Sequence, residues 1–272
     1  MLAAITGVVT GLAVRGFEYV VEEIYHHVLE APLWLAAIAP GIGLVVAAAI
    51  LRLGGGASPS TSDEYLRAFH DPAYRLRPRY LGARIAASIA TLGSGGALGL
   101  EGPSLYGGSA IGSMIQRRLP SPFRGSDHRT LLVAGAAAGV AAIFKAAATG
   151  AIFALEVPYR DDMARRMLLP ALVASATGYL TFVTLSDTTP LLAVSVFDIP
   201  SFEFIDLLGA RLVGATCAVG ARAFAKLMRI AKGISLRSLP PRLLISSLSM
   251  VGLFFLSREL TGLPLSLGAG YE

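Results

Sequence analysis

Residues 93–103 read GSGGALGLEGP, and the chain continues as SLYGGSAIGSMIQRR up to Arg118. Apolar residues flank this stretch for tens of positions on both sides, and one carboxylate, Glu101, lies inside it. Proline is common at the first position of a helix, because its missing N–H needs no partner there. The stretch therefore predicts a helix that starts at Pro103 and ends near residue 117, with Gly102 near its N-cap.

A helix start of this kind is a candidate anion site. We expect the N–H groups of Ser104, Leu105 and Tyr106 to point back toward Glu101, where hydrogen bonding and the helix dipole both favour negative charge. Glu101 can then act as a tethered anion that competes with a free one. In a soluble protein such a carboxylate would more often only cap its helix. At membrane depth a charge costs about 2.5–3.5 kcal/mol even on the lower estimates, so an ionisable residue there is a functional candidate.

The composition points to an integral membrane protein. Of 272 residues, 54% are hydrophobic and 15% are charged, against about 25% charged residues in soluble domains. The mean hydropathy is +0.64. The net charge of +5 suits basic loops at lipid headgroups better than a nucleic-acid surface. The one cysteine, Cys217, excludes an internal disulfide and is expected to be a buried filler. Met1 opens onto a helical pattern without the features of a signal peptide.

Apolar, helix-like stretches recur along the chain. The stretch 131–155 is too rich in glycine and alanine for one simple span, so we expect two helices broken near residues 145–150. Lys145 would lie at that break, where it can snorkel or meet a carbonyl end, and a role in conduction is a weaker hypothesis. The other predicted helices cover residues 3–29, 31–51, 64–70, 81–92, 167–185, 204–232 and 243–256.

A second helix start is predicted after residues 54–63, which read GGGASPSTSD. Ser60, Thr61, Ser62 and Asp63 are all residue types that cap helix N-termini. Their hydroxyls and amides could meet an anion, as at Glu101. An ordinary polar surface loop explains the same residues equally well, and the sequence leaves both readings open.

Other chemistries find less support. An intramembrane enzyme with Ser94 as nucleophile would need a base, and Lys145 is the only candidate, because all four histidines fall in predicted loops or helix ends. A nucleotide-binding glycine loop is disfavoured because Glu101 would repel a phosphate. The adjacent His26 and His27 lack further ligands nearby, so no metal site is expected. We therefore predict a protein that is not an enzyme.

The second part of the chain repeats the beginning of the first. Residues 204–232 are similar to residues 3–29 in length and place, residues 243–256 to residues 32–51, and residues 262–271 to the break at 54–63. Duplication with interrupted helices is typical of transporters. We expect one all-α, polytopic transmembrane domain over residues 1–272, with a first repeat in 1–200 and the beginning of a second in 201–272. The second copy stops before the counterpart of Ser60, so a truncated chain is expected.

The motif in 93–103, together with AGAAAGVAAIFKAAATGAIFALE in 134–156, resembles the CLC family of chloride channels and proton/chloride antiporters. The resemblance implies a CLC-like inverted repeat that carries chloride or similar anions across the cell membrane without a cofactor or nucleic-acid partner. It also implies a homodimer that uses apolar faces such as residues 167–185. By position, Glu101 would be the gating glutamate and Ser60 the hydroxyl that coordinates the central anion. The implied anion-binding residues are Ser60, with Thr61 or Ser62 as substitutes, Gly99, Gly102, Pro103 and Ser104.

Two departures from the family pattern bear on mechanism. Leu100 stands where the family's Gly-Lys/Arg-Glu-Gly-Pro signature has a basic residue, which should weaken the positive field outside the gate. Val157 stands where antiporters commonly carry an inner glutamate, and valine there is typical of the channel branch. Glu156 could substitute, although a structural role is favoured. The resemblance thus implies channel-like chloride transport, with proton/chloride antiport as the alternative.

Overall fold

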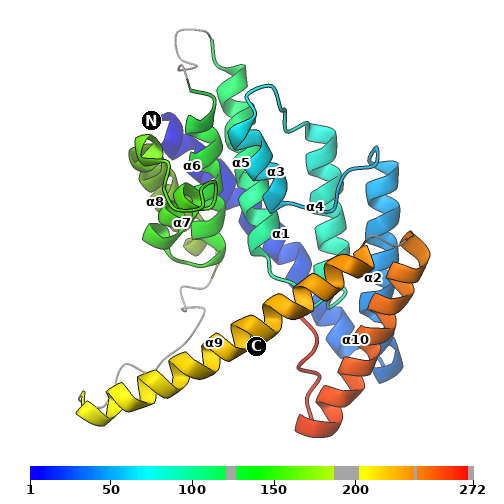
Figure 1. Cartoon of the computed structure of the whole chain (residues 1–272). Coiled ribbons are helices and arrows are strands. Elements are labelled where there is room, and N and C mark those ends of the chain that lie inside the picture. Colours follow the sequence, from blue (N-terminus) through cyan, green and yellow to red (C-terminus); the bar gives the residue numbers. More distant parts are fainter. Residues whose placement is uncertain (121–126, 187–201, 236–237, 269–272) are drawn as a thin grey trace.

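The computed structural model describes residues 1–120, 127–186, 202–235 and 238–268, and every regular element within them is helical (Figure 1). The predicted all-α fold is therefore confirmed. A 3-10 turn (Arg165–Met167) precedes α8. The helices are α1 (Leu2–Glu30), α2 (Leu33–Leu53), α3 (Ser62–His70), α4 (Pro78–Gly93), α5 (Glu101–Arg118), α6 (Arg129–Ile143), α7 (Ala147–Glu156), α8 (Leu168–Val183), α9 (Phe204–Ser235) and α10 (Leu239–Thr261).

Helix α6 forms the centre of the bundle. All of its residues from Leu131 to Ile143 are buried, and it packs against α1, α5, α7 and α8. Backbones approach closely on the α5 side. A Cβ atom added to Gly112 would lie 1.8 Å from the carbonyl oxygen of Leu131, and one added to Gly108 would lie 2.1 Å from that of Gly135. Only glycine fits at these crossings, as expected where transmembrane helices pack through small residues.

Glycine residues also allow close backbone packing between α1 and α8. A Cβ atom on Gly7 would lie 2.3 Å from the carbonyl oxygen of Ala174, and one on Gly11 would lie 2.6 Å from that of Gly178. Two turns of α1 therefore rest directly on the backbone of α8. The high glycine content of the chain, noted in the sequence, is used here for helix contact.

Within the described residues, five helical segments are long and apolar enough to cross a membrane: Leu2–Glu30, Leu33–Leu53, Arg165–Val183, Phe204–Ile234 and Leu239–Thr261. Large apolar side chains face outward from them, including Trp34 at 64% and Leu169 at 72% exposure. The predicted break between two apolar helices is confirmed. Helix α6 ends at Ile143, α7 begins at Ala147, and Lys145 lies between them with a φ of 51°.

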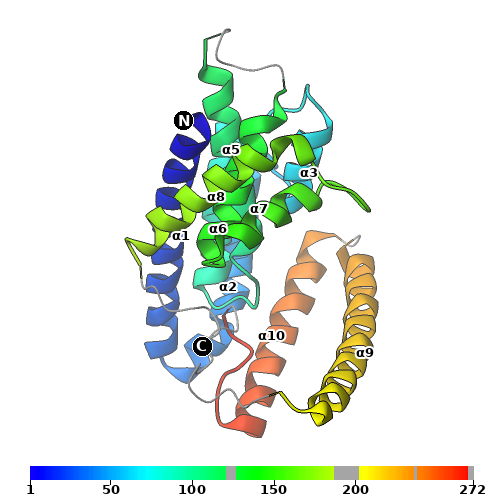
Figure 2. The same ribbon diagram turned by 90° about the vertical axis from the view of Figure 1, so that its left-hand side faces the viewer.

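Helices α9 and α10 form a hairpin beside the bundle, as Figures 1 and 2 both show. Helix α10 packs against α2, whereas α9 is exposed along nearly all of its length. Cys217 lies on α9 and is exposed, so the expectation of a buried filler is wrong. After α10, the N–H of Gly268 donates to the carbonyl oxygen of Gly95 at 3.2 Å. The predicted boundary between residues 200 and 201 lies outside the described residues.

Candidate anion-binding site

The helix that follows the glycine-rich stretch begins earlier than the sequence predicts. Helix α5 starts at Glu101 with Leu100 as its N-cap, so Pro103 occupies the third helical position. The N–H of Ser104 donates to the carbonyl oxygen of Leu100 at 3.1 Å. The N–H groups of Ser104, Leu105 and Tyr106 therefore lie inside the helix, and the expectation that they would be open is wrong. The prediction failed because proline is tolerated throughout the first turn, where helix N–H groups have no partner within the helix. The first N–H group that bonds within the helix is that of Ser104, so the backbone N–H groups of Leu100, Glu101 and Gly102 lie before the first such bond.

The Glu101 side chain is half-buried and folds back over the loop before α5. A Cβ atom added to Gly99 would lie 1.6 Å from one carboxylate oxygen of Glu101 and 2.9 Å from the other. The carboxylate therefore rests where any larger residue at position 99 would put its side chain. Gly99 thus provides the seat for the Glu101 carboxylate.

The two predicted helix starts, at α3 and α5, lie next to each other. Helix α3 begins at Ser62 with Thr61 as its N-cap residue. The hydroxyl oxygen of Thr61 lies 2.7 Å from the position that a Cβ atom on Gly102 would take. The hydroxyl of Ser60 instead donates to the carboxylate of Asp63 at 2.7 Å. Thr61 is therefore the hydroxyl-bearing residue that lies against the start of α5, while Ser60 bonds within its own turn.

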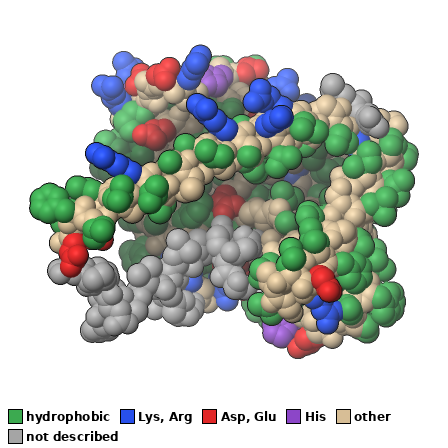
Figure 3. All heavy atoms as spheres, turned by 60° about the horizontal axis from the view of Figure 1, so that its bottom comes forward, with side chains coloured by type: hydrophobic (Ala, Val, Ile, Leu, Met, Phe, Trp, Pro, Cys, Tyr) green, Lys and Arg blue, Asp and Glu red, His purple; other side chains and the backbone are tan. Residues whose placement is uncertain are grey.

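A cavity of about 540 Å³ lies beside these two helix starts. Thr61, Gly99, Gly102 and Pro103 line it, and Ser60 and Ser104 do not. Among the described residues that line it there is no carboxylate, but there are three arginines: Arg52, Arg84 and Arg242. Figure 3 shows a face of the molecule that is largely covered by apolar side chains and hollowed in its middle. Cationic groups and helix starts that converge on one cavity favour an anion.

A buried ion pair lies next to this cavity, and our sequence reasoning missed it. Arg84 of α4 is 4% exposed and Glu64 of α3 is 7% exposed. Their side chains meet at 3.1 Å between Nη2 and Oε1, and the hydroxyl of Tyr74 donates to the second carboxylate oxygen. The sequence does indicate Arg84, because an ionisable residue in the apolar run 81–92 is energetically unfavourable in a membrane and is therefore a functional candidate.

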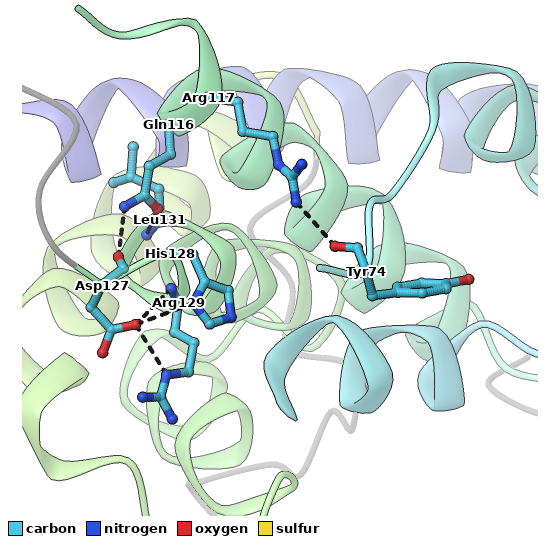
Figure 4. A network of polar contacts seen from close by, with 7 residues as sticks. All are labelled: Tyr74, Gln116, Arg117, Asp127, His128, Arg129 and Leu131. Carbon is cyan, nitrogen blue, oxygen red and sulfur yellow. Dashed lines mark hydrogen bonds and ion pairs between the residues drawn. The ribbon is translucent and has the colours of Figure 1, made fainter. Parts of the chain in front are cut away.

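The far end of α5 is held by a polar network (Figure 4). The amide nitrogen of Gln116 donates to the carbonyl oxygen of Asp127 at 2.7 Å, and its oxygen accepts the N–H of Leu131 at 3.0 Å. The Asp127 carboxylate accepts the N–H and the Nε of Arg129 at 2.9 and 3.0 Å. Burial raises the pKa of Asp127, but these bonds outweigh it and hold that pKa below its ordinary value. The network joins α5 to the start of α6, at the end of α5 that lies away from Glu101.

Comparison with known proteins identifies the family. A family model described as voltage gated chloride channel matches residues 42–272. The chain belongs to the voltage-gated chloride channel family. Curated relatives include an H(+)/Cl(-) exchange transporter ClcA from Cronobacter sakazakii, 33% identical over 168 residues, and chloride channel protein CLC-e from Arabidopsis thaliana, 38% identical over 133 residues. The matches cover 57% and 47% of this chain, but only 36% and 18% of these relatives.

A solved structure supports the same fold. The crystal structure of a CLC-type fluoride/proton antiporter superimposes with a TM-score of 0.80 at 22% identity, over 98% of this chain and 66% of that one. The resemblance to the CLC family that the sequence indicates is thereby confirmed. The chain is an integral membrane protein with the helical fold of this voltage-gated chloride channel family.

Glu101 and the remaining sequence-derived candidates are not among the described residues that line the cavity. Glu156 is exposed at the end of α7, and Val157 packs against the main apolar core. Lys145 is half-buried in the turn between α6 and α7, and its charge acts on Glu18 of α1. The hydroxyl of Ser94, the nucleophile of the enzyme alternative, donates to the carbonyl oxygen of Thr91 at 2.9 Å.

Proposed function

We propose that this chain provides a transmembrane path for chloride or a similar anion, and that Glu101 is its gate. One observation carries the proposal. The Glu101 carboxylate rests on Gly99 at the start of α5, beside a cavity whose lining, in the described part of the chain, contains three arginines and no carboxylate. The carboxylate can occupy the place of a free anion when it is charged. It leaves that place when it is protonated or displaced.

The path would bind an anion through partial charges. The first-turn amides of α5 and the start of α3 supply positive potential without a fixed full charge at the binding point. Thr61 adds a hydroxyl donor, which can lie this close to the start of α5 because Gly102 has no side chain. Binding of this kind stays weak enough for release, which conduction requires. The side chains of Arg52 and Arg242 would raise the local anion concentration.

Two modes of transport fit this gate. Channel-like transport is favoured by Val157, because an apolar residue in the core offers no inner proton acceptor at that position. Proton-coupled exchange is favoured by relatives that are H(+)/Cl(-) exchange transporters and by the antiporter with the same fold. We propose gated anion transport as the common function and treat coupling to protons as the quantity to be measured.

The assembly and the repeat organisation are part of the same proposal. We propose a homodimer in the cell membrane that uses the exposed apolar face of α8, where Leu169 and Leu180 are 72% and 56% exposed. We also propose that residues 1–200 and 201–272 form the first repeat and the beginning of the second. The pairing of α1 and α2, with 29 and 21 residues, against α9 and α10, with 32 and 23 residues, supports that division.

The test is chloride flux from liposomes that contain the purified full chain. We expect low pH to raise the flux of the wild type, because protonation of Glu101 removes the competing charge. The Glu101→Gln variant should conduct at every pH and lose the pH dependence. Glu156→Gln is the matched control, since it neutralises an exposed carboxylate at the end of α7 rather than at the start of α5. A Glu101→Gln variant that behaves like the wild type would refute the gate.

The same liposomes separate the two modes. A chloride gradient that drives proton movement, abolished in Glu101→Gln, would establish exchange. Chloride flux without proton movement would establish a channel. If the wild-type chain moves neither chloride nor fluoride under any condition, the proposed function fails. Fluoride is tested as well as chloride, since a protein of the same fold carries fluoride. Flux of fluoride alone would mean that the path selects a different anion.

A further inference from the structure

One guanidinium group connects the elements that form both helix starts. Arg84 uses each of its three nitrogens for a different segment of the chain. Its Nε donates to the carbonyl oxygen of Ser58 at 2.9 Å, its Nη1 to the hydroxyl of Tyr106 at 2.8 Å, and its Nη2 contacts the carboxylate of Glu64 at 3.1 Å. The group also lies over the ring of Tyr106, 5.0 Å from its centroid.

These contacts lie immediately around the candidate site. Ser58 belongs to the loop that leads into Thr61, Glu64 lies in the first turn of α3, and Tyr106 lies on α5 shortly after Glu101. We propose that Arg84 is the positioning residue of the anion site, and that its guanidinium sets the spacing between the starts of α3 and α5. This inference rests on the proposed function.

The charge of Arg84 is balanced locally, which argues against a direct electrostatic role. Glu64 faces it at ion-pair distance, and both side chains are buried. The pair is therefore close to neutral when seen from the cavity. Arg52 and Arg242 line the same cavity, and no carboxylate is among the other lining residues that the structure describes. The net positive potential comes from these two side chains, and Arg84 acts through geometry.

The chemistry of the side chain explains why arginine suits this place. A guanidinium is planar and presents its donors in a rigid fork, whereas an ammonium presents all of its donors from one nitrogen. Lysine at position 84 would keep the charge but could not hold Ser58, Glu64 and Tyr106 in the same arrangement. The spacing at the site is tight, because the Thr61 hydroxyl lies 2.7 Å from the Cβ position of Gly102. A small shift of α3 against α5 would therefore change the anion site.

The two possible roles of Arg84 make opposite predictions for Glu64→Gln. If the charge of Arg84 mattered, removing its counter-charge would make the site more positive and tighten anion binding. If Arg84 positions the site, the same substitution loosens one of its three attachments and weakens binding. Arg84→Lys also distinguishes the two roles, since lysine keeps the positive charge but lacks the planar arrangement of donors.

The experiment measures chloride affinity by titration calorimetry on the purified full chain, together with half-saturating chloride and maximal flux in liposomes. We expect Glu64→Gln and Arg84→Lys each to weaken chloride affinity by about three- to tenfold, as loss of part of a charge-assisted network would. Maximal flux per folded protein should change less. Arg79→Lys is the matched control on the same helix, because Arg79 is exposed and bonds only the carbonyl of Leu53 among the contacts described. Its affinity should equal that of the wild type.

Tighter or unchanged binding in Glu64→Gln would overturn the inference. A purely structural role would lower the yield of folded protein and the maximal flux while the affinity of the folded fraction stayed the same, and this result would also overturn it. If neither Glu64→Gln nor Arg84→Lys folds, Tyr106→Phe tests the positioning role, since it removes one hydroxyl and one of the three contacts of Arg84. Unchanged affinity there refutes the positioning role. A wild-type chain that binds neither chloride nor fluoride refutes the proposed function and this inference together.

Discussion

Replacing Gly99 with alanine places a methyl group where the Glu101 carboxylate now lies. The added Cβ would be 1.6 Å from the nearest carboxylate oxygen, so this separation has to grow to about 3.0 Å or more. Gly99 is not among the glycines with positive φ, so its backbone accepts alanine. The atom that must move is the end of a flexible side chain. We expect the free energy of unfolding to change by less than about 1 kcal/mol.

The effect on the gate should be larger than the effect on stability. Forcing a side chain about 30° from its rotamer costs about 0.5–1.5 kcal/mol. The occupancy of the seat by the Glu101 carboxylate, relative to a competing anion, should then fall by about two- to twelvefold. We expect Gly99→Ala to raise chloride flux at neutral pH by a factor in this range. Its pH dependence should be weaker than that of the wild type.

The assay is chloride efflux from liposomes at neutral and acidic pH, with thermal unfolding measured on the same preparations. Gly82→Ala is the control, because a Cβ atom on Gly82 of α4 would meet nothing within 4 Å. The control should match the wild type in flux. If Gly99→Ala folds normally and keeps the flux and pH dependence of the wild type, the carboxylate does not gate the path from this seat.

Two further predictions concern stability. Gly112→Ala should lower the unfolding free energy by about 1–3 kcal/mol, because its Cβ would press on a backbone carbonyl of α6, whereas Gly214→Ala on exposed α9 should leave the melting temperature unchanged or raise it slightly. The pKa of Asp127 lies below its ordinary value of 3.8 because the bonds from Arg129 outweigh the effect of burial. The stability from these bonds is fully present above that ordinary value and is lost as pH falls through the lower, folded-state pKa. Asp127→Asn should therefore lack this acid-dependent loss of melting temperature, and an equal loss in both proteins would contradict the assignment.

The sequence predicted the parts of the fold that depend on local backbone chemistry. The break between α6 and α7 at Lys145 and the helix start near Glu101 both follow from glycine, alanine and proline at neighbouring positions. The start was placed two residues late, because the first turn of a helix accepts proline at more than one position. The membrane class followed from composition, which needs no knowledge of contacts.

The contacts at the site needed the tertiary structure. Ser60 and Thr61 are equivalent as cap residues in the sequence, and only the packing of α3 against α5 brings Thr61 to Gly102. The pairing of Arg84 with Glu64 spans twenty positions and depends on how α3, α4 and α5 lie together. Local signals determine where a helix begins or breaks, because they act through missing N–H groups and missing Cβ atoms. Which side chains meet is decided by the burial of whole helices against one another.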